Sequence, residues 1–297
     1  MKNIQIIDIS DKANYDKKGW LCEENLIFFS DEWNLRNSQC INYINSCNGK
    51  YDRKIHGRKC VVLRINDSAV AKLFIDDYHI QGSNNLSVVY FGLYYEGELV
   101  AVMSLGRHSR QIAENRIVLD RFCVKSGVHV QGGASKLFAH CIMWAKEMNY
   151  DEIISFSDNR WTRGHIYEVL GFSLDKEHKS DYCYVDTNYP HHRLSKQSQK
   201  KGATKCPEGF TELQWCEFRG LSRLWDCGKK RWVYYLKSGI SHKEILSSRC
   251  AEQHKNGCFK HSHIRGYFKS VKCGCDIYYG SSYELRCMYL LEKDDLV

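Results

Sequence analysis

The strongest constraint on the fold is the stretch "HVQGGASKLFAH" at residues 129–140. It follows the strand-like run "IVLDRFCV", and its two adjacent glycines lead into a helical apolar pattern. A helix that begins at such a turn directs its first backbone amides towards a ligand, and its dipole favours negative charge. The stretch predicts an anion-binding turn between a strand and a helix. A glycine turn needed only for close packing is the alternative.

The segments around this turn alternate between strand and helix patterns. Strands are expected at 59–65, 87–97, 98–106, 117–124, 151–158 and 181–186, and helices at 67–80, 133–149 and 164–172. Asp67 or Ser68 would cap the first helix, and "EGE" would close a hairpin. This order predicts an α/β or α+β fold, a mixed sheet with helices on both faces. A further hairpin is expected around Gly228.

Composition argues for a globular chain without a membrane span. No run of about 18 apolar residues occurs, and "MKNIQIIDIS" has no apolar signal core, so a cytoplasmic location is expected. The 15 cysteines are an odd number. In a reducing compartment they are expected to be mostly buried thiols rather than a disulfide framework.

Positive charge is concentrated late in the chain. Residues 191–272 hold 18 Lys and Arg against 6 Asp and Glu. Such a segment suggests a nucleic acid or another polyanion as partner, and a solvated basic face is the alternative. The predicted DNA contacts in it are Lys200, Lys201, Lys229, Lys230 and Arg231.

Two motifs resemble the GNAT acyltransferases over about residues 60–186. "HVQGGA" places Gly132 and Ala134 as in the family's pyrophosphate loop, with His129 where Gln or Arg is expected, and "IYEVLGF" is similar to a second signature. The resemblance implies an acyl-CoA donor bound by His129, Gln131, Gly132, Gly133, Ala134, Ser135 and Lys136. It also implies that Tyr167 is the general acid, whereas a core aromatic is the alternative.

Further candidate residues follow strand or helix ends, where ligands bind in open sheets. In "SDNRWTRG", Asp158 could accept a proton or orient a base, Arg160 could clamp a phosphate, and Trp161 lies beside them. Tyr78 and His79, in "DDYHIQGS", could act as an acid–base pair or bind a metal, or be structural. Arg107 and Arg110, in "RHSR", could contact phosphate or form a solvated turn.

Together, "DYHIQG", "RFCVKSGVHVQGGASKLF" and "SDNRWTRGHIYEVLGF" resemble GNAT-like proteins of bacteriophages and mobile elements, similar to the phage Mom DNA-modification proteins. That resemblance implies a DNA substrate, with adenine as the modified base and evasion of restriction as the role. Base flipping would bring a duplex base to the pocket.

The two ends suggest a different origin. "LIFFSDEWNLR" and "KIHGRKC" resemble the end of a patch-repair or homing nuclease domain, and "SSYE" with Glu284 resembles the start of a restriction-endonuclease-like domain. A lone Glu cannot support two-metal hydrolysis, so these ends are interpreted as remnants or as partners of a nuclease from the same mobile element. A zinc site could be formed by Cys250, His254 and Cys258, completed by His261 or by His263, Cys273 and Cys275. Unliganded thiols and surface histidines are the alternative.

The predicted segments are a nuclease-like end (1–53), the GNAT-like domain (54–190), a basic extension (191–240) and a Cys/His-containing basic segment (241–297). The first functional hypothesis is a transferase that modifies a DNA base with an acyl-CoA donor. The second is a catalytically degenerate DNA-binding module associated with a nuclease. A small-molecule or protein acetyltransferase is a third hypothesis, which leaves the basic segment unexplained.

Overall fold

The computed structural model describes residues 3–20, 25–107, 115–189 and 192–236, with 266–270, 275–279, 285 and 288. The chain divides into two compact units, Met1–Tyr234 and Tyr235–Val297. In the second unit, β15 (Gly266–Ser270) pairs antiparallel with β16 (Cys275–Tyr279). Among the described helices, none is both long and apolar enough to cross a membrane.

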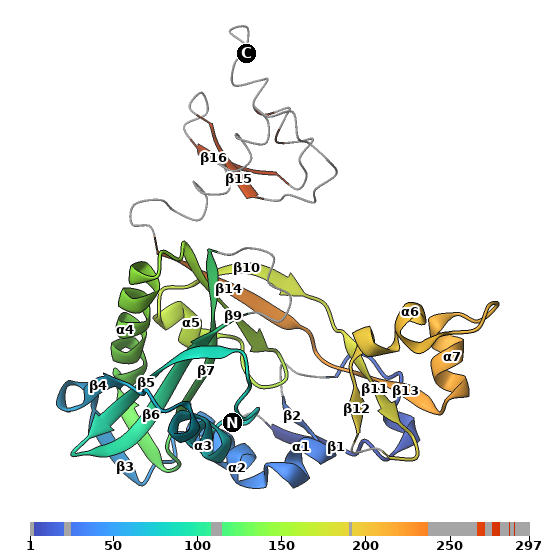
Figure 1. Cartoon of the computed structure of the whole chain (residues 1–297), viewed down its shortest axis with the longest axis horizontal. Coiled ribbons are helices and arrows are strands. Elements are labelled where there is room, and N and C mark those ends of the chain that lie inside the picture. The colour runs from blue at the N-terminus through green and yellow to red at the C-terminus, as the bar shows by residue number, and fades with distance from the viewer. Residues whose placement is uncertain are drawn as a thin grey trace, which may run out of the picture. The chain divides into compact units, whose positions relative to one another are not determined.

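A seven-stranded mixed sheet forms the centre of the first unit (Figure 1). Its order is β10-β14-β9-β7-β6-β5-β4. The bounds are β4 (Val61–Arg64), β5 (Ser87–Tyr95), β6 (Glu98–Gly106), β7 (Arg116–Val124), β9 (Glu152–Asp158), β10 (Ser173–His178) and β14 (Lys229–Tyr235). Strands β4 to β7 are antiparallel neighbours, whereas β7 and β9 are parallel.

Helices cover both faces of this sheet. Tyr90 of β5 packs in a cluster with Ala71 and Ile75 of α3 (Ser68–Tyr78). Leu93, on the opposite face of the strand, lies next to Gly133 at the start of α4 (Gly133–Glu147). The predicted mixed sheet with helices on both faces is therefore confirmed, as is the Asp67 cap, which accepts a hydrogen bond from Ala69 N.

Strands β7 and β9 pair only where they begin. The parallel register joins Arg116–Val118 to Glu152–Ile154, yet β7 continues to Val124 and β9 to Asp158. Beyond the paired residues, both strands line the same cavity. The sheet is therefore open at the carboxyl ends of two parallel strands, where α/β proteins commonly bind ligands.

The N-terminal residues are part of this unit. Strand β1 (Asn3–Ile7) pairs with β2 (Asn25–Phe29), followed by α1 (Ser30–Leu35) and α2 (Asn37–Cys47). Strand β3 (Arg53–His56) pairs parallel with β8 (Val128–Gln131), directly before α4. Short 3-10 turns lie at Lys12–Asn14 and Gly57–Lys59. The segment resembling a nuclease end thus packs with the predicted GNAT-like domain.

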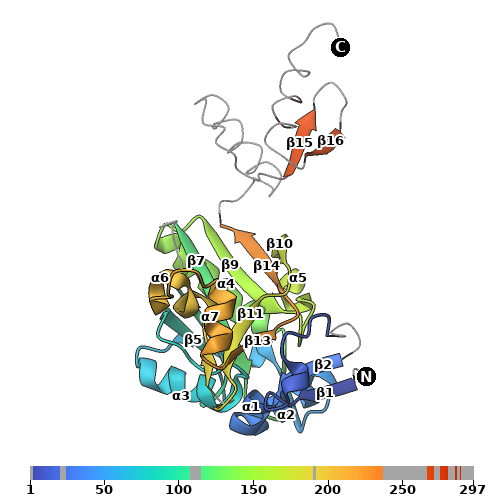
Figure 2. The ribbon, with the colours of Figure 1, turned by 90° about the vertical axis from the view of Figure 1, so that its right-hand side faces the viewer.

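A smaller sheet lies at the end of the unit away from α4 (Figures 1 and 2). It contains β12 (Arg193–Leu194), β11 (Tyr182–Asp186) and β13 (Leu221–Trp225). The connection from β12 to β13 holds a 3-10 turn (Lys196–Gln199), α6 (Lys201–Thr204) and α7 (Glu212–Phe218). We call this sheet with α6 and α7 the basic lobe. The short α5 (His165–Val169) lies between β9 and β10 in the chain.

The predicted hairpin around Gly228 is wrong. Strand β13 pairs with β11 in the basic lobe, whereas β14 pairs with β10 in the large sheet. Gly228 has φ +79°, and a Cβ there would lie 2.3 Å from His178 O. The chain therefore crosses from the basic lobe to the large sheet at a position where only glycine fits.

The predicted boundary at residue 190 differs from the compact unit. Strand β14 comes from the predicted basic extension, yet it is an inner strand of the large sheet. The cysteines follow the expectation in most described cases: eight are free thiols, whereas Cys227 is disulfide-bonded.

Candidate active site

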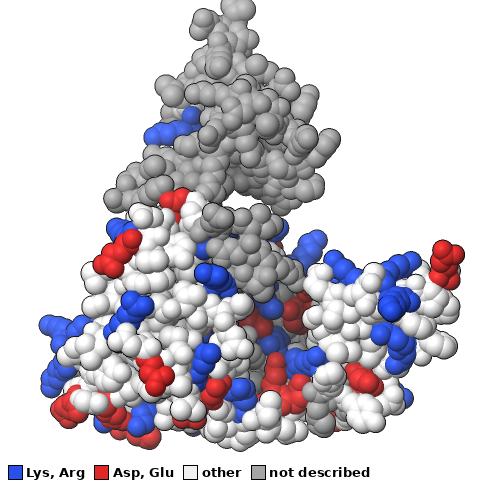
Figure 3. Space-filling model, in the orientation of Figure 1, with Lys and Arg blue, Asp and Glu red and all other residues white. Residues whose placement is uncertain are grey.

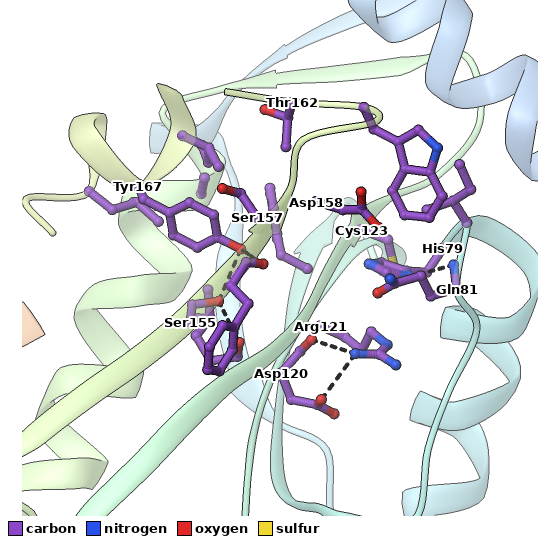
Figure 4. A pocket seen from close by; sticks show the side chains of 18 of the residues that line it. His79, Gln81, Asp120, Arg121, Cys123, Ser155, Ser157, Asp158, Thr162 and Tyr167 are labelled. Carbon is purple, nitrogen blue, oxygen red and sulfur yellow. Dashed lines mark hydrogen bonds and ion pairs between the residues drawn. The ribbon is translucent and has the colours of Figure 1, made fainter. Parts of the chain in front are cut away.

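A cavity of about 1270 Å³ opens where β7 and β9 separate (Figure 4). It reaches from the start of α4 to the strand β14. The predicted site residues that line it are Tyr78, His79, Arg107, His129, Gly132, Ala134, Ser135, Asp158, Trp161, Tyr167, Lys229 and Arg231. One space therefore unites the glycine turn, the candidate acid and the candidate acceptor residues.

The glycine turn presents the first amides of α4 to this cavity. Gly132 is the N-cap of the helix and has φ +73°, a left-handed conformation that a side chain disfavours, and its Cβ position has open space around it. Gly133 serves packing, because a Cβ there would meet Val130 and Leu93 at 2.9–3.0 Å. Gly133 thus fits the close-packing interpretation, whereas anion binding at the open Gly132 end stays a prediction.

Three other residues predicted to bind the donor, Lys136, His129 and Gln131, have different surroundings. Lys136 donates to the carbonyls of Gly57 and Cys60 at 3.1 and 2.5 Å, so its ammonium fastens α4 to the turn after β3. The ring of His129 stacks obliquely on Tyr51 with centroids 4.8 Å apart. Gln131 is exposed and lines a second cavity.

Tyr167 of α5 is held by hydrogen bonds and rings. Its hydroxyl lies 2.9 Å from Ser155 Oγ and 3.3 Å from Phe156 O, and its ring stacks on Trp232 at 5.6 Å. Burial raises the pKa of Tyr167, while the Ser155 hydrogen bond and the charge of Arg121 oppose that shift. The phenol therefore keeps its proton at neutral pH, as a proton donor must.

Asp158 ends β9 with its side chain almost fully buried. Arg160 donates to it through the backbone N at 3.0 Å and Nη2 at 2.9 Å. The same guanidinium donates to Glu32 of α1 at 2.8 Å. Although burial opposes its charge, Asp158 and Glu32 raise the pKa of Arg160 above its ordinary value. The Arg160 guanidinium is thus paired with carboxylates inside the protein and orients Asp158. The sequence had instead predicted that it would clamp a phosphate.

Trp161 likewise faces the N-terminal segment. Its Nε1 donates to Ile27 O at 2.9 Å, and its ring packs against Phe28 and Tyr43. It lines the cavity with the remainder of its surface. Arg193 of β12 extends the ionic network by pairing with Asp31 and Glu32. The wall beside Asp158 is therefore built from distant segments of the chain.

His79 follows α3 and faces the cavity beside Tyr78. Burial, aided by the charges of Arg121 and Arg36, lowers the pKa of His79 to about 3. Its Nδ1 accepts a hydrogen bond from Gln81 N at 3.1 Å. The ring is therefore neutral at pH 7 with its proton on Nε2, where it can donate to a ligand. Tyr78 packs edge-on against Phe74.

Arg121 of β7 is a site residue that sequence reasoning missed. Its Nε donates to Gly82 O at 2.7 Å and its Nη1 to Asp120 at 2.8 and 3.0 Å, and it lies near His79 in the cavity (Figure 4). Asp120 is itself held by Asn84 Nδ2 and Ser87 Oγ. An Arg in a buried strand was the sequence signal, because such a charge needs partners.

Two serines and a tryptophan beside Tyr167 were also missed. Trp232 Nε1 donates to Ser157 Oγ at 2.9 Å, and Ser155 Oγ lies 2.8 Å from Leu119 O. Both serines are almost fully buried on β9. Alternate serines in a buried strand point to one face and indicate a polar wall.

The predicted basic contacts fall into two groups. On β14, Lys229, Lys230 and Arg231 pair with Asp226, Glu177 and Asp175 at 3.2–3.8 Å. Lys200 and Lys201, before and within α6, are exposed. Figure 3 shows a hollow between the body of the unit and the basic lobe, where basic and acidic side chains both lie. Arg107 is exposed at the cavity rim.

Several predicted residues lie outside the described part of the chain. They are Arg110, Glu284 and the proposed zinc ligands Cys250, His254, Cys258 and His261. The described residues contain no group of three or more His, Cys, Asp or Glu that could hold a metal ion. The zinc prediction is therefore untested by the described structure.

The fold and cavity define a class of protein with an open mixed sheet and a shared pocket. The start of α4, the buried phenol of Tyr167 and the fixed carboxylate of Asp158 all line that pocket. The model of the Mom protein family matches residues 60–253. The chain belongs to the Mom protein family, which the sequence motifs resembled.

No curated protein matches the chain. Solved structures that match include the ribosomal-protein-S18-alanine N-acetyltransferase of Escherichia coli, with 11% identity, 62% of this chain and 97% of that chain covered, and a TM-score of 0.36. A GNAT family acetyltransferase of Elizabethkingia anophelis with acetyl-CoA bound has 12% identity, 60% and 98% coverage, and a TM-score of 0.35.

Proposed function

We propose that this protein transfers a group from an acyl-CoA-type donor to a base in DNA, with adenine as the target. One observation carries the proposal: a single cavity joins the amides at the start of α4 to Tyr167 and to Asp158. Membership of the Mom protein family supports DNA as the substrate, since the motifs resemble phage DNA-modification proteins.

The donor end of the cavity fits a pyrophosphate. Gly132 keeps the approach to the amides of Gly133, Ala134 and Ser135 open, because a Cβ is absent at the N-cap. These first-turn amides have no acceptor within the helix and can bind phosphate oxygens. When bound, the donor supplies an activated acyl group on a thioester.

Tyr167 acts as the proton donor in this proposal. Its raised pKa keeps the hydroxyl protonated, and Ser155 fixes the oxygen. The Ser155 hydroxyl has one proton, which it can donate to Leu119 O. The Tyr167 hydroxyl then donates its own proton to Ser155 Oγ or to Phe156 O until a leaving group accepts that proton. The phenol can thus protonate a leaving thiolate.

Asp158, His79 and Arg121 face the acceptor. Arg160 holds the carboxylate of Asp158 in place, so that a carboxylate oxygen can accept a hydrogen bond from an exocyclic amine of a base. His79 Nε2–H and Arg121 supply donors for acceptor atoms of the base ring. A base in duplex DNA would have to be flipped out to reach them.

Exposed cations on the basic lobe would contact the DNA backbone. Lys200 and Lys201 supply charge at a distance from the cavity, and Arg107 supplies it at the rim. Such contacts give affinity that falls with salt and does not depend on sequence.

Mass spectrometry of nucleosides from plasmid DNA co-expressed with the protein tests this function. We expect a new nucleoside whose added mass identifies the transferred group, and its loss with Tyr167→Phe. The matched control is Tyr189→Phe, because Tyr189 is 71% exposed and away from the cavity. Unmodified DNA combined with salt-sensitive DNA binding would favour the degenerate binding module instead.

A further inference from the structure

A second, smaller cavity of about 370 Å³ lies on the outer face of the β3–β8 pair. Its lining includes Tyr51, Lys54, His56, His129 and Gln131. None of the described residues that line it is acidic. This cavity adjoins the glycine turn, since Gln131 directly precedes Gly132.

The register of the two strands explains why these side chains share a face. Lys54 pairs with His129 and His56 with Gln131, while Ile55 and Val130 between them are buried. Side chains alternate across a strand, so the four polar residues point away from the core together. The outer face is therefore polar and carries the Lys54 cation.

A ring pair joins the two cavities. Tyr51 and His129 line both spaces, and their ring centroids are 4.8 Å apart. The hydroxyl of Tyr51 donates to Ser46 O at 2.8 Å, which fixes the phenol ring on the last turns of α2. The aromatic surface is thus held in place before any ligand binds.

We infer that this smaller cavity binds the adenosine 3′-phosphate end of the donor, an inference that rests on the proposed function. The purine lies against the ring pair of Tyr51 and His129, because aromatic rings stack with any base. Lys54 pairs with the 3′-phosphate as a charged donor. The pyrophosphate continues from there to the amides of Gly133 to Ser135.

Isothermal titration of the full chain with CoA and with dephospho-CoA, which lacks only the 3′-phosphate, tests the Lys54 contact. We expect the wild type to bind CoA about tenfold more tightly than dephospho-CoA, the effect of one charged hydrogen bond. Lys54→Met should abolish that ratio and leave dephospho-CoA affinity unchanged. Lys146→Met, at the exposed far end of α4, is the control that should retain the ratio.

The ring pair is tested with the same two ligands. Tyr51→Ala should weaken both about tenfold, because a base stacked on an aromatic ring loses its platform, whereas Tyr51→Phe should keep near wild-type affinity. Unchanged CoA affinity in both Lys54→Met and Tyr51→Ala would overturn this inference and leave the proposed function standing. A wild type that binds neither ligand would overturn the donor assignment together with the inference.

Discussion

Arg160 and Glu32 are 128 residues apart in sequence, and their side chains meet at 2.8 and 3.0 Å. The same guanidinium fixes Asp158, so the candidate acceptor carboxylate depends on a helix from the N-terminal segment. Arg193 of the basic lobe binds the same Glu32. Three distant parts of the chain are thereby joined in one ionic network, which is buried at Arg160 and Asp158 and partly exposed at Glu32 and Arg193.

Replacing Arg160 should destabilise the protein strongly. Arg160→Met leaves two carboxylates beside an apolar side chain, and breaking a buried pair costs about 3–5 kcal/mol. Lys196→Met, which breaks the exposed pair with Asp181, should cost no more than about 1 kcal/mol. Urea unfolding of both variants measures the difference. Equal losses would contradict the structural role given to Arg160.

The neutral state of His79 should make stability depend on pH. The folded pKa is about 3 against an ordinary 6.5, so between these values the unfolded chain binds a proton that the folded chain refuses. Stability is therefore expected to fall as the pH drops below 6.5, by about 1 kcal/mol per pH unit. His79→Gln should flatten this slope between pH 7 and 5 in urea unfolding.

The control for this slope is His165→Gln. The side chain of His165 is 84% exposed, so its substitution should leave the pH dependence of the wild type intact. A wild-type slope in His79→Gln would show that the ring titrates in the folded protein as it does in water.

Gly132→Ala should impair donor binding with a limited cost in stability. The left-handed backbone at φ +73° penalises a Cβ by roughly 1–2 kcal/mol. The added methyl also narrows access to the first amides of α4. Gly202→Ala, in α6 with open space and ordinary φ, should be neutral. CoA titration and thermal unfolding measure both effects, and unaltered CoA affinity in Gly132→Ala would count against the turn as the phosphate site.

Cys123 lines the cavity but should not take part in the reaction. Burial raises the pKa of its thiol well above the ordinary value, so no nucleophilic thiolate forms near neutral pH. Cys123→Ala should keep the modified nucleoside in co-expressed plasmid DNA. In alkylation with iodoacetamide, the exposed Cys47 should react and Cys123 should not. Loss of the nucleoside in a folded Cys123→Ala protein would contradict this assignment.

The parts of the site predicted from sequence share a local origin. Neighbouring residues specify the glycine turn, the cap at Asp67 and the short helix that carries Tyr167. Sequence motifs were therefore sufficient to locate these features. Arg160 was misassigned because its partner Glu32 lies far away in the chain, and no local pattern shows which carboxylate a guanidinium meets. For Arg121, the sequence shows an Arg within a buried strand, but it does not show that Gly82, 39 residues away, is one of its partners.

The fold, too, was predicted where neighbouring residues determine it and missed where distant residues do. Alternation and helical periodicity predicted most strands and helices from 59 to 186, and the mixed sheet is confirmed. They missed β8 and β10, and the strand expected at 181–186 lies in the smaller sheet. The hairpin at Gly228 failed because two strand patterns with a glycine between them are typical of a hairpin, whereas here each strand finds a partner in another sheet. Pairing between distant strands is decided by packing, which local sequence does not contain.

Strand β14 has a consequence for how the chain is made. It lies between β9 and β10, so the large sheet has a gap until the ribosome has added residues up to Tyr235. Until then, β9 and β10 expose backbone edges that invite pairing with other chains. An expression fragment ending near residue 190 would hold this unfinished state permanently. Recombinant production therefore requires the polypeptide through Tyr235, even for work on the cavity alone.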